Sequence, residues 1–393
     1  MSLIATNRIT ELLPALGVDL GSHIAKFVQM DQPSGRIEIR AAGAFPIEGG
    51  LIEAGIVRDP KRLGKAIATS LKKWGVGTSA SVVSIPSNLA VLRWVQLPCL
   101  PPEELRDAAR FKVKRHLPFP VHNAYVQASQ PDVQDGDSTG ASLVIAVPRE
   151  VIDTRAEALE YAGLVPVGAE LEAQAILRVI ERKLSEQSAL WRDASLTIID
   201  VGANNTHMYV VQNQRLQFIR GVKFGTWGII QAISKEFNLN RAEAENLISA
   251  PGAELWTDGV LKLQFNDVPA YVFVGPELEK LTREFMRLLR YFRSLHPERS
   301  YAGILDHIVV CGGVASLPGF AEYLHQVLEL QVERARPFAG MVGKFNKDTF
   351  DVIANRQEAY TVVVGLALSG LTGRVKTKGE VDGGSEFAWT RVA

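Results

Sequence analysis

The stretch "GVDLGSHIAKFVQM", residues 17–30, decides the fold. Apolar positions come before and after a run of turn-forming residues, so the stretch predicts two strands joined by a tight turn. A buried hairpin has no structural need for Asp19, Gly21 and Lys26 beside one another. Either these residues form an ordinary turn, or they prepare a place for a negatively charged group.

A second stretch, "TIIDVGANNTHMYVV" (197–211), repeats this pattern half a chain later. Asp200 corresponds to Asp19 and Gly202 to Gly21, and a second strand follows the turn in each copy. A repeated strand–turn–strand unit indicates a duplicated domain. The duplication predicts two Asp-x-Gly turns that face each other, where backbone N–H groups cradle phosphate oxygens and two carboxylates hold Mg²⁺ through water.

The composition narrows the class of protein. The chain has 393 residues, 47% of them hydrophobic, with 43 Lys and Arg against 43 Asp and Glu. This is usual for a globular protein of two or three domains, and it provides no overall attraction for nucleic acid. The apolar run "YTVVVGLALSGL" (360–371) is too short to span a bilayer, and no signal peptide is recognisable. We therefore expect a cytoplasmic protein without a transmembrane anchor, and two free, buried cysteines.

A third glycine-containing segment follows the two Asp-x-Gly turns. "HIVVCGGVASLPGFAEYL" (307–324) predicts a strand, a Gly312-Gly313 turn and a helix, and glycines let the backbone approach a flat ligand closely. Together with the two Asp-x-Gly turns, it resembles the phosphate-one, phosphate-two and adenosine motifs of the actin-like ATPase superfamily (actin, heat-shock chaperone, sugar kinase).

Further segments narrow the resemblance to one family. From about Leu16 to Gly373 the chain resembles the PilM family, cytoplasmic actin-like proteins of type IV pilus assembly. The segments that carry this likeness are "LPPEELRDAARFKVKRHLPFPV" (100–121), "GLVPVGAELEAQAIL" (163–177) and "RQEAYTVVVGLALSGL" (356–371).

The resemblance implies an α/β actin-like ATPase fold with two duplicated lobes and a small inserted subdomain. The large subdomain of the first lobe is expected at 16–89 and 166–194, with the inserted subdomain at 90–165. The large subdomain of the second lobe is expected at 195–226 and 300–374, with a smaller subdomain at 227–299. An N-terminal segment (1–15) and a flexible tail (375–393) flank these parts.

The resemblance also implies ATP or ADP and Mg²⁺ as ligands, with weak or absent hydrolysis. The residues that match the family's nucleotide-binding motifs are Asp19, Gly21, Ser22, Lys26, Asp200, Gly202, Asn204, Lys280, Glu284, Arg287, Gly312 and Gly313. Asp19 and Asp200 would hold Mg²⁺ through water.

Three of these assignments have simpler alternatives. For Lys26 the alternative is a solvated strand residue. Glu172 stands near the position from which superfamily members orient the attacking water, and it is the candidate catalytic residue; an exposed helix residue without a role is the alternative. Lys280, Glu284 and Arg287 are expected to border the adenosine pocket, and the alternative is the solvated polar face of an amphipathic helix at 276–296.

The implied function is a nucleotide-binding scaffold at the inner face of the inner membrane. Its implied partner is the N-terminal cytoplasmic segment of a PilN-like membrane protein, held between the first large subdomain and the inserted one. Other pilus motor components and further copies of the chain are additional candidate partners. "RITELLP" (8–14) loosely resembles the segment that PilN proteins present. One hypothesis is that it occupies this chain's own cleft or that of a neighbouring copy, and the alternative is a frayed terminus.

Two other functions compete. An FtsA-like division protein would need an amphipathic membrane helix, and the tail at 373–393 lacks helical apolar spacing. A small-molecule kinase of the same superfamily would need a carboxylate base, for which Glu172 is the candidate.

Overall fold

The chain folds into two units. The computed structural model describes residues 16–33, 35–76, 80–133, 137–185, 195–212, 215–295, 307–343 and 346–371. The first unit comprises Met1–Arg178, Gly340–Thr349 and Val362–Ala393, and the second comprises Val179–Ala339 and Phe350–Thr361. The expected N-terminal segment with its "RITELLP" stretch and the expected tail at 375–393 lie outside the described residues.

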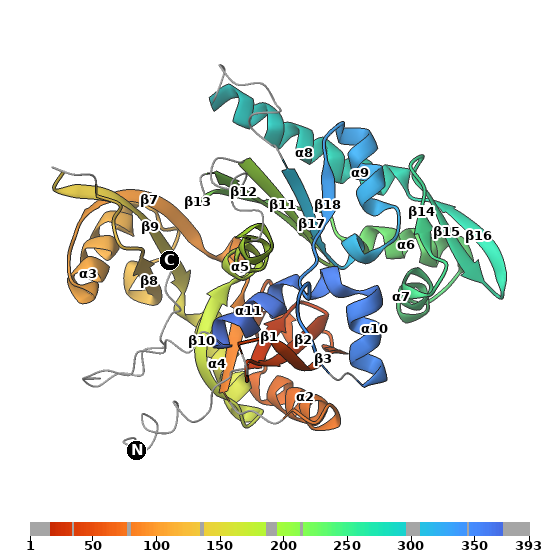
Figure 1. Cartoon of the computed structure of the whole chain (residues 1–393), viewed down its shortest axis with the longest axis horizontal. Helices are drawn as coiled ribbons and strands as arrows, with labels where there is room; N and C mark the ends of the chain where they lie inside the picture. The colour runs from red at the N-terminus through yellow and green to blue at the C-terminus, as the bar shows by residue number, and fades with distance from the viewer. Residues whose placement is uncertain are drawn as a thin grey trace. The chain divides into compact units, whose positions relative to one another are not determined.

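The first unit is built on a five-stranded sheet in the order β10-β6-β1-β2-β3. Its strands are β1 (Leu16–Leu20), β2 (Ile24–Asp31), β3 (Glu38–Pro46), β6 (Ala80–Ile85) and β10 (Val165–Leu171). Helices α2 (Pro60–Lys73) and α4 (Arg149–Tyr161) cover one face, and α11 (Thr361–Leu371) covers the other (Figure 1). A short pair, β4 (Ile52–Glu53) and β5 (Ile56–Val57), and helix α5 (Glu172–Ser185) complete it.

The alternation of β1 explains where its residues point. Leu16, Val18 and Leu20 enter the apolar core beneath α2 and α4. Because successive side chains of a strand point to opposite faces, Gly17 and Asp19 belong to the face that α11 covers.

A smaller sheet is inserted between β6 and β10. Its strands are β7 (Val91–Pro98), β8 (Ala124–Ala128) and β9 (Thr139–Pro148), in the order β7-β9-β8, and helix α3 (Pro102–Val113) packs on it around a separate apolar core. Both cysteines are free, as expected, but Cys99 is exposed because it lies in the link between β7 and α3. Our expectation that it is buried was wrong.

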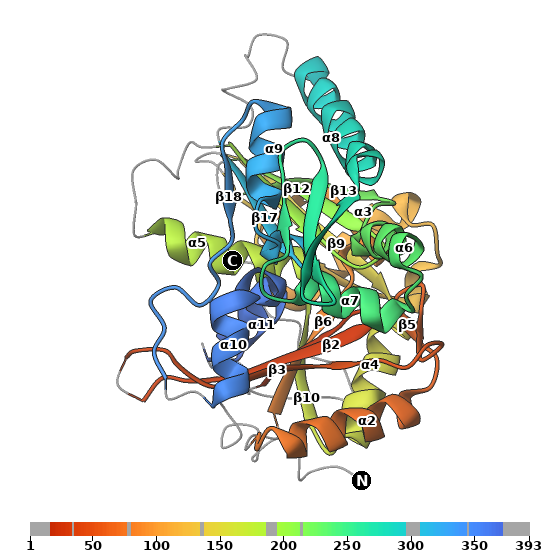
Figure 2. The ribbon, with the colours of Figure 1, turned by 90° about the vertical axis from the view of Figure 1, so that its right-hand side faces the viewer.

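The second unit is built on a five-stranded sheet in the order β13-β12-β11-β17-β18. Its strands are β11 (Ser195–Val201), β12 (Thr206–Gln212), β13 (Arg215–Val222), β17 (His307–Gly312) and β18 (Val332–Arg334). Between β13 and β17 the chain forms α6 (Thr226–Phe237), α7 (Arg241–Ser249), the three-stranded sheet β14 (Glu254–Leu255), β15 (Val260–Phe265) and β16 (Val268–Phe273), and the long α8 (Gly275–Leu295) (Figure 2). Helices α9 (Phe320–Leu328) and α10 (Lys347–Asn355) follow β17.

The two sheets repeat one topology, which confirms the duplication predicted from the sequence. Read from one edge, β10-β6-β1-β2-β3 corresponds to β18-β17-β11-β12-β13. In each sheet the first strand of the hairpin pairs antiparallel with the next strand and parallel with a later one. Asp19 lies opposite Lys26 in the first hairpin, and Asp200 lies opposite His207 in the second. The finer subdomain boundaries remain predictions.

Replacing Gly365 with alanine should destabilise the first unit. A Cβ at this position would lie 2.0 Å from the main-chain oxygen of Ala175 in α5, and a main-chain atom cannot move aside as a side chain can. Alanine gains about 1 kcal/mol in helix propensity over glycine, but the overlap outweighs this gain. We expect Gly365→Ala to lower the free energy of unfolding by about 1–3 kcal/mol in urea titrations. Gly49→Ala, which meets no atom within 4 Å, is the matched control; equal stability of the two variants would contradict the packing argument.

Candidate functional site

The first Asp-x-Gly turn holds a buried carboxylate beside a cation. Asp19 is 6% exposed, and the Lys26 Nζ lies 3.4 Å from its Oδ2 across the hairpin. Gly21 is half-buried and Ser22 exposed in the turn between them. The ion pair and the partial burial of Lys26 speak against a solvated strand residue, and the role of Lys26 toward a ligand stays a prediction.

Glu172 is held by a hydrogen bond and interacts electrostatically with Asp19 of this turn. It begins α5 directly after β10, and its Oε2 accepts a hydrogen bond of 3.1 Å from the backbone N–H of Ser87. The Ser87 hydroxyl in turn accepts from the Ala173 N–H at 3.0 Å. Burial, and next the charge of Asp19, raise the pKa of Glu172 to about 7. Glu172 is half-buried and not exposed as the alternative assumed, and its catalytic role stays a prediction.

Arg155 is a member of this cluster that the sequence reasoning missed. It lies on α4, is 0% exposed, and its Nη1 donates to the Val151 carbonyl oxygen at 3.0 Å. Its Nε and Nη2 have no hydrogen-bond partner among the described residues. Burial lowers the pKa of Arg155 to about 10, and the charges of Glu172 and Asp19 oppose that shift.

The second Asp-x-Gly turn repeats the geometry of the first. A Cβ on Gly21 would lie 2.8 Å from the Ile24 carbonyl oxygen, and a Cβ on Gly202 would lie 2.9 Å from the Asn205 carbonyl oxygen. Asp200 is half-buried at the end of β11. Both turns therefore bring main-chain groups close together, three residues apart, beside an aspartate.

The Gly312-Gly313 turn closes around Asp200. Gly312 has φ +88°, and a Cβ there would lie 2.7 Å from the Asp200 Oδ1. The N–H of Gly313 donates to the Val201 carbonyl oxygen at 2.9 Å, and Thr226 at the start of α6 donates its N–H to Gly202 at 3.0 Å. Four of the predicted residues, Asp200, Gly202, Gly312 and Gly313, are thus brought together in the second unit.

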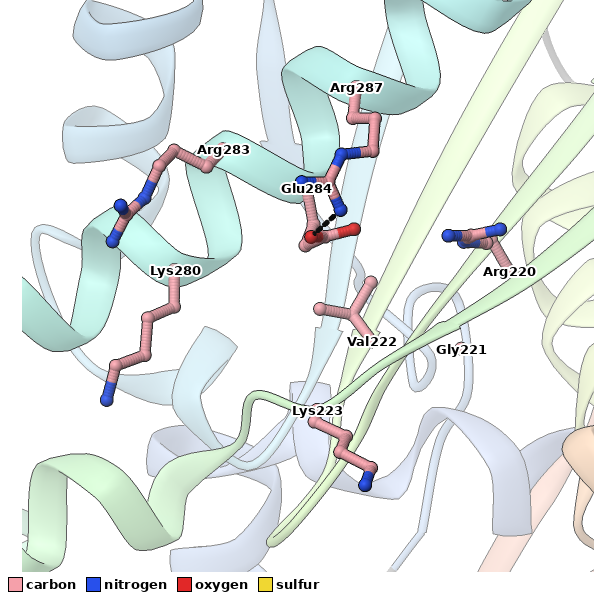
Figure 3. A pocket seen from close by; sticks show the side chains of 8 residues that line it. All are labelled: Arg220, Gly221, Val222, Lys223, Lys280, Arg283, Glu284 and Arg287. Atoms are coloured by element: carbon pink, nitrogen blue, oxygen red, sulfur yellow. Dashed lines mark hydrogen bonds and ion pairs between the residues drawn. The ribbon is translucent and has the colours of Figure 1, made fainter.

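The second unit has two neighbouring pockets with lining residues in common. The larger has a volume of about 470 Å³ and contains the predicted residues Lys280, Glu284 and Arg287 of α8 (Figure 3). The smaller, of about 170 Å³, contains Asn204 beside Gly225. Lys223 and Lys280 line both pockets. Lys280, Glu284 and Arg287 therefore line a cavity, which a solvated helix face does not require. Their contact with a nucleotide stays a prediction.

The residues fit a nucleotide better than a protein-held metal. Among the described residues no three His, Cys, Asp or Glu side chains are grouped to hold a metal ion. Mg²⁺ prefers water and phosphate oxygens with one or two carboxylates, so Asp19 and Asp200 suit an ion that arrives with a nucleotide. The predicted residues of the first unit are Asp19, Gly21, Ser22, Lys26 and Glu172, and those of the second unit are Asp200, Gly202, Asn204, Lys280, Glu284, Arg287, Gly312 and Gly313.

Comparisons with known proteins agree with one another. A family model described as type IV pilus assembly protein PilM matches residues 17–371. A solved structure, the PilM-PilN type IV pilus biogenesis complex, superposes with a TM-score of 0.74 at 25% identity, and covers 92% of this chain and 99% of that chain.

Two curated sequences are more distant. Cell division protein FtsA of Streptococcus pneumoniae serotype 2 is 23% identical over 351 residues, which are 81% of this chain and 74% of that protein. Type II secretion system protein L of Xanthomonas campestris pv. campestris is 36% identical over 69 residues, 18% of each chain. The α/β fold is that of the actin-like proteins, as the sequence predicted. In the described ranges no helix is long and apolar enough to cross a membrane.

Proposed function

This chain belongs to the PilM family of type IV pilus assembly proteins, and on that premise we propose that it is a nucleotide-binding scaffold. It binds ATP or ADP with Mg²⁺, and its partner is the N-terminal cytoplasmic segment of a PilN-like protein of the inner membrane. The proposal that it binds a nucleotide rests on the duplicated hairpin. In each of the two five-stranded sheets, an Asp-x-Gly turn follows the first strand of the hairpin. The solved PilM-PilN complex supports the choice of partner.

In this proposal different residues contact the phosphates, the Mg²⁺ ion and the attacking water. Main-chain N–H groups around Gly21, Gly202 and Gly313 approach phosphate oxygens, and Lys26 adds a positive charge. Asp19 and Asp200 would hold Mg²⁺ through water, and the ion would neutralise phosphate charge. Glu172, whose pKa is raised to about 7, can accept a proton from an attacking water near neutral pH, which is where a general base is most effective.

Mg-ATP should raise the melting temperature of the protein. Ligand at a hundred times its dissociation constant adds about 2.7 kcal/mol to the free energy of unfolding, which corresponds to roughly 5–10 °C for domains of this size. Differential scanning fluorimetry measures the rise, which should be smaller without Mg²⁺. Lys26→Ala and Asp200→Ala should each remove most of it, whereas Lys61→Ala, an exposed lysine of α2, should not. A wild-type protein with no shift at millimolar Mg-ATP would refute nucleotide binding.

The inserted subdomain is proposed to recognise the partner. Helix α3 buries Leu105, Ala109 and Val113, and it leaves Phe111 77% exposed beside a basic run at Lys114–His116. An exposed aromatic residue next to cations is typical of a protein-contact surface. The partner's membrane segment would bring this chain to the inner face of the membrane.

Charge reversal at this surface should alter partner binding alone. Lys114→Glu with Arg115→Glu should change the affinity for a PilN-like N-terminal peptide by about tenfold in titration calorimetry, and should leave the Mg-ATP melting shift intact. The matched control reverses two exposed lysines of α2, Lys61→Glu with Lys65→Glu. Loss of the Mg-ATP melting shift in the first variant would contradict the proposal that the inserted subdomain binds the partner and not the nucleotide.

FtsA-like division activity is the second candidate, and the 23% identity to FtsA over 81% of this chain is what favours it. The family model and the structural match to PilM outweigh that observation.

A further inference from the structure

The larger pocket of the second unit carries an excess of positive charge. Five cationic side chains line it, and Glu284 is the one carboxylate among its lining residues. Arg220 and Lys223 come from the end of β13, and the other three come from α8: Lys280, Arg283 and Arg287 (Figure 3). At about 470 Å³ the pocket is large enough for a nucleoside.

Among the residues that the structure describes, a neighbouring carboxylate neutralises two of the five cations. Lys280 contacts Glu277 at 2.6 Å, and Arg287 forms an ion pair with Glu284. Arg283 donates its Nε to a main-chain oxygen of its own helix, that of Glu279, at 3.3 Å. In the part of the chain that the structure describes, neither Arg220, Lys223 nor Arg283 has a carboxylate partner.

Binding of ATP or ADP does not account for these three cations without a carboxylate partner. The 5′ phosphates belong near the glycine turns, and the smaller pocket with Asn204 and Gly225 lies on that side. The larger pocket would then receive the nucleoside, which carries no charge. Guanidinium groups are the side chains best suited to bind phosphate, because their N–H groups match two phosphate oxygens at once.

We propose that this pocket selects a nucleotide with a further phosphate on its ribose, at the 2′ or 3′ position, in addition to the 5′ phosphates. The inference rests on the proposed nucleotide binding and names the class of nucleotide. Arg220 is the residue that recognises the added phosphate, and Lys223 and Arg283 contribute their charge.

Titration calorimetry with three nucleotides tests this proposal: ADP, ADP 2′-phosphate and ADP 3′-phosphate. One of the two ribose phosphates should bind about tenfold more tightly than ADP at low salt, and this preference should shrink as the salt concentration rises. Arg220→Gln with Arg283→Gln should remove the preference while ADP affinity stays within about twofold. The control is Arg290→Gln, an exposed arginine of α8 that does not line the pocket, and it should keep the preference.

The outcomes separate this inference from the proposed function. ADP binding without any gain from a ribose phosphate overturns the inference and leaves nucleotide binding in place. Absence of binding by all three nucleotides overturns both. Tripolyphosphate that binds as tightly as the phosphorylated ADP would show a general polyanion site, and it would also overturn the inference.

Discussion

Replacing Glu172 with glutamine is expected to stabilise the protein by up to about 3 kcal/mol at pH 8 and by less than about 1 kcal/mol at pH 5. Burial and the charge of Asp19 raise the pKa of Glu172 to about 7, from an ordinary value of 4.5. The folded chain therefore binds this proton more tightly than the unfolded chain. The free energy of unfolding falls as the pH rises from about 4.5 to about 7, and the loss persists above pH 7.

Glutamine isolates the charge because it keeps the shape and an acceptor oxygen for the Ser87 N–H. Urea titrations of both proteins at pH 5 and pH 8 measure the effect. Glu157→Gln, on the exposed face of α4, is the control and should be neutral at both values. If Glu172→Gln is no more stable than the wild type at pH 8, Glu172 is not a destabilised carboxylate. A charge kept at the expense of stability is typical of a functional position.

The sequence predicted the parts of the fold that depend on local pattern. Asp-x-Gly between two apolar strands is visible in the residues themselves, and its second copy at Asp200 predicted the duplicated sheet. The capping box of Asn240 and Glu243 at the start of α7 is a feature of the same kind, because it involves residues three positions apart. Such features need only neighbouring residues, so a single sequence is sufficient to find them.

The environment of Glu172 and the role of Arg155 could not be predicted in this way. The environment of Glu172 depends on the strand β10 bringing α5 next to Ser87, a contact between residues 85 positions apart. One signal was available: Arg155 occupies the apolar stripe of α4, three or four residues from Val151, Ile152, Ala158 and Leu159. A charged residue on the buried face of a helix indicates a partner elsewhere in the fold. The cationic pocket likewise depends on β13 and α8 meeting.

Arg155 is expected to be the counter-ion of the two carboxylates, so its removal should be costly. Loss of one member of a buried charge cluster typically costs about 3–5 kcal/mol, because the remaining charges keep their burial without compensation. Arg155→Met fills most of the volume, so we expect a loss of about 3 kcal/mol at pH 8. The loss should be smaller at pH 5, where Glu172 is protonated and needs less compensation.

A double-mutant cycle between Arg155→Met and Glu172→Gln separates charge from packing. If the guanidinium stabilises the ionised Glu172, its loss in the Glu172→Gln background should cost less by about 1–3 kcal/mol at pH 8. The same cycle at pH 5 should show little coupling, because the carboxyl is neutral there. Removal of the positive charge also raises the pKa of Glu172 further, so the single Arg155→Met variant should continue to lose stability above pH 7, where the wild type has levelled. An equal cost of Arg155→Met in both backgrounds would mean that this buried arginine packs against the core without acting on the carboxylate. The pH dependence then separates the two accounts, because packing alone is insensitive to the protonation of Glu172.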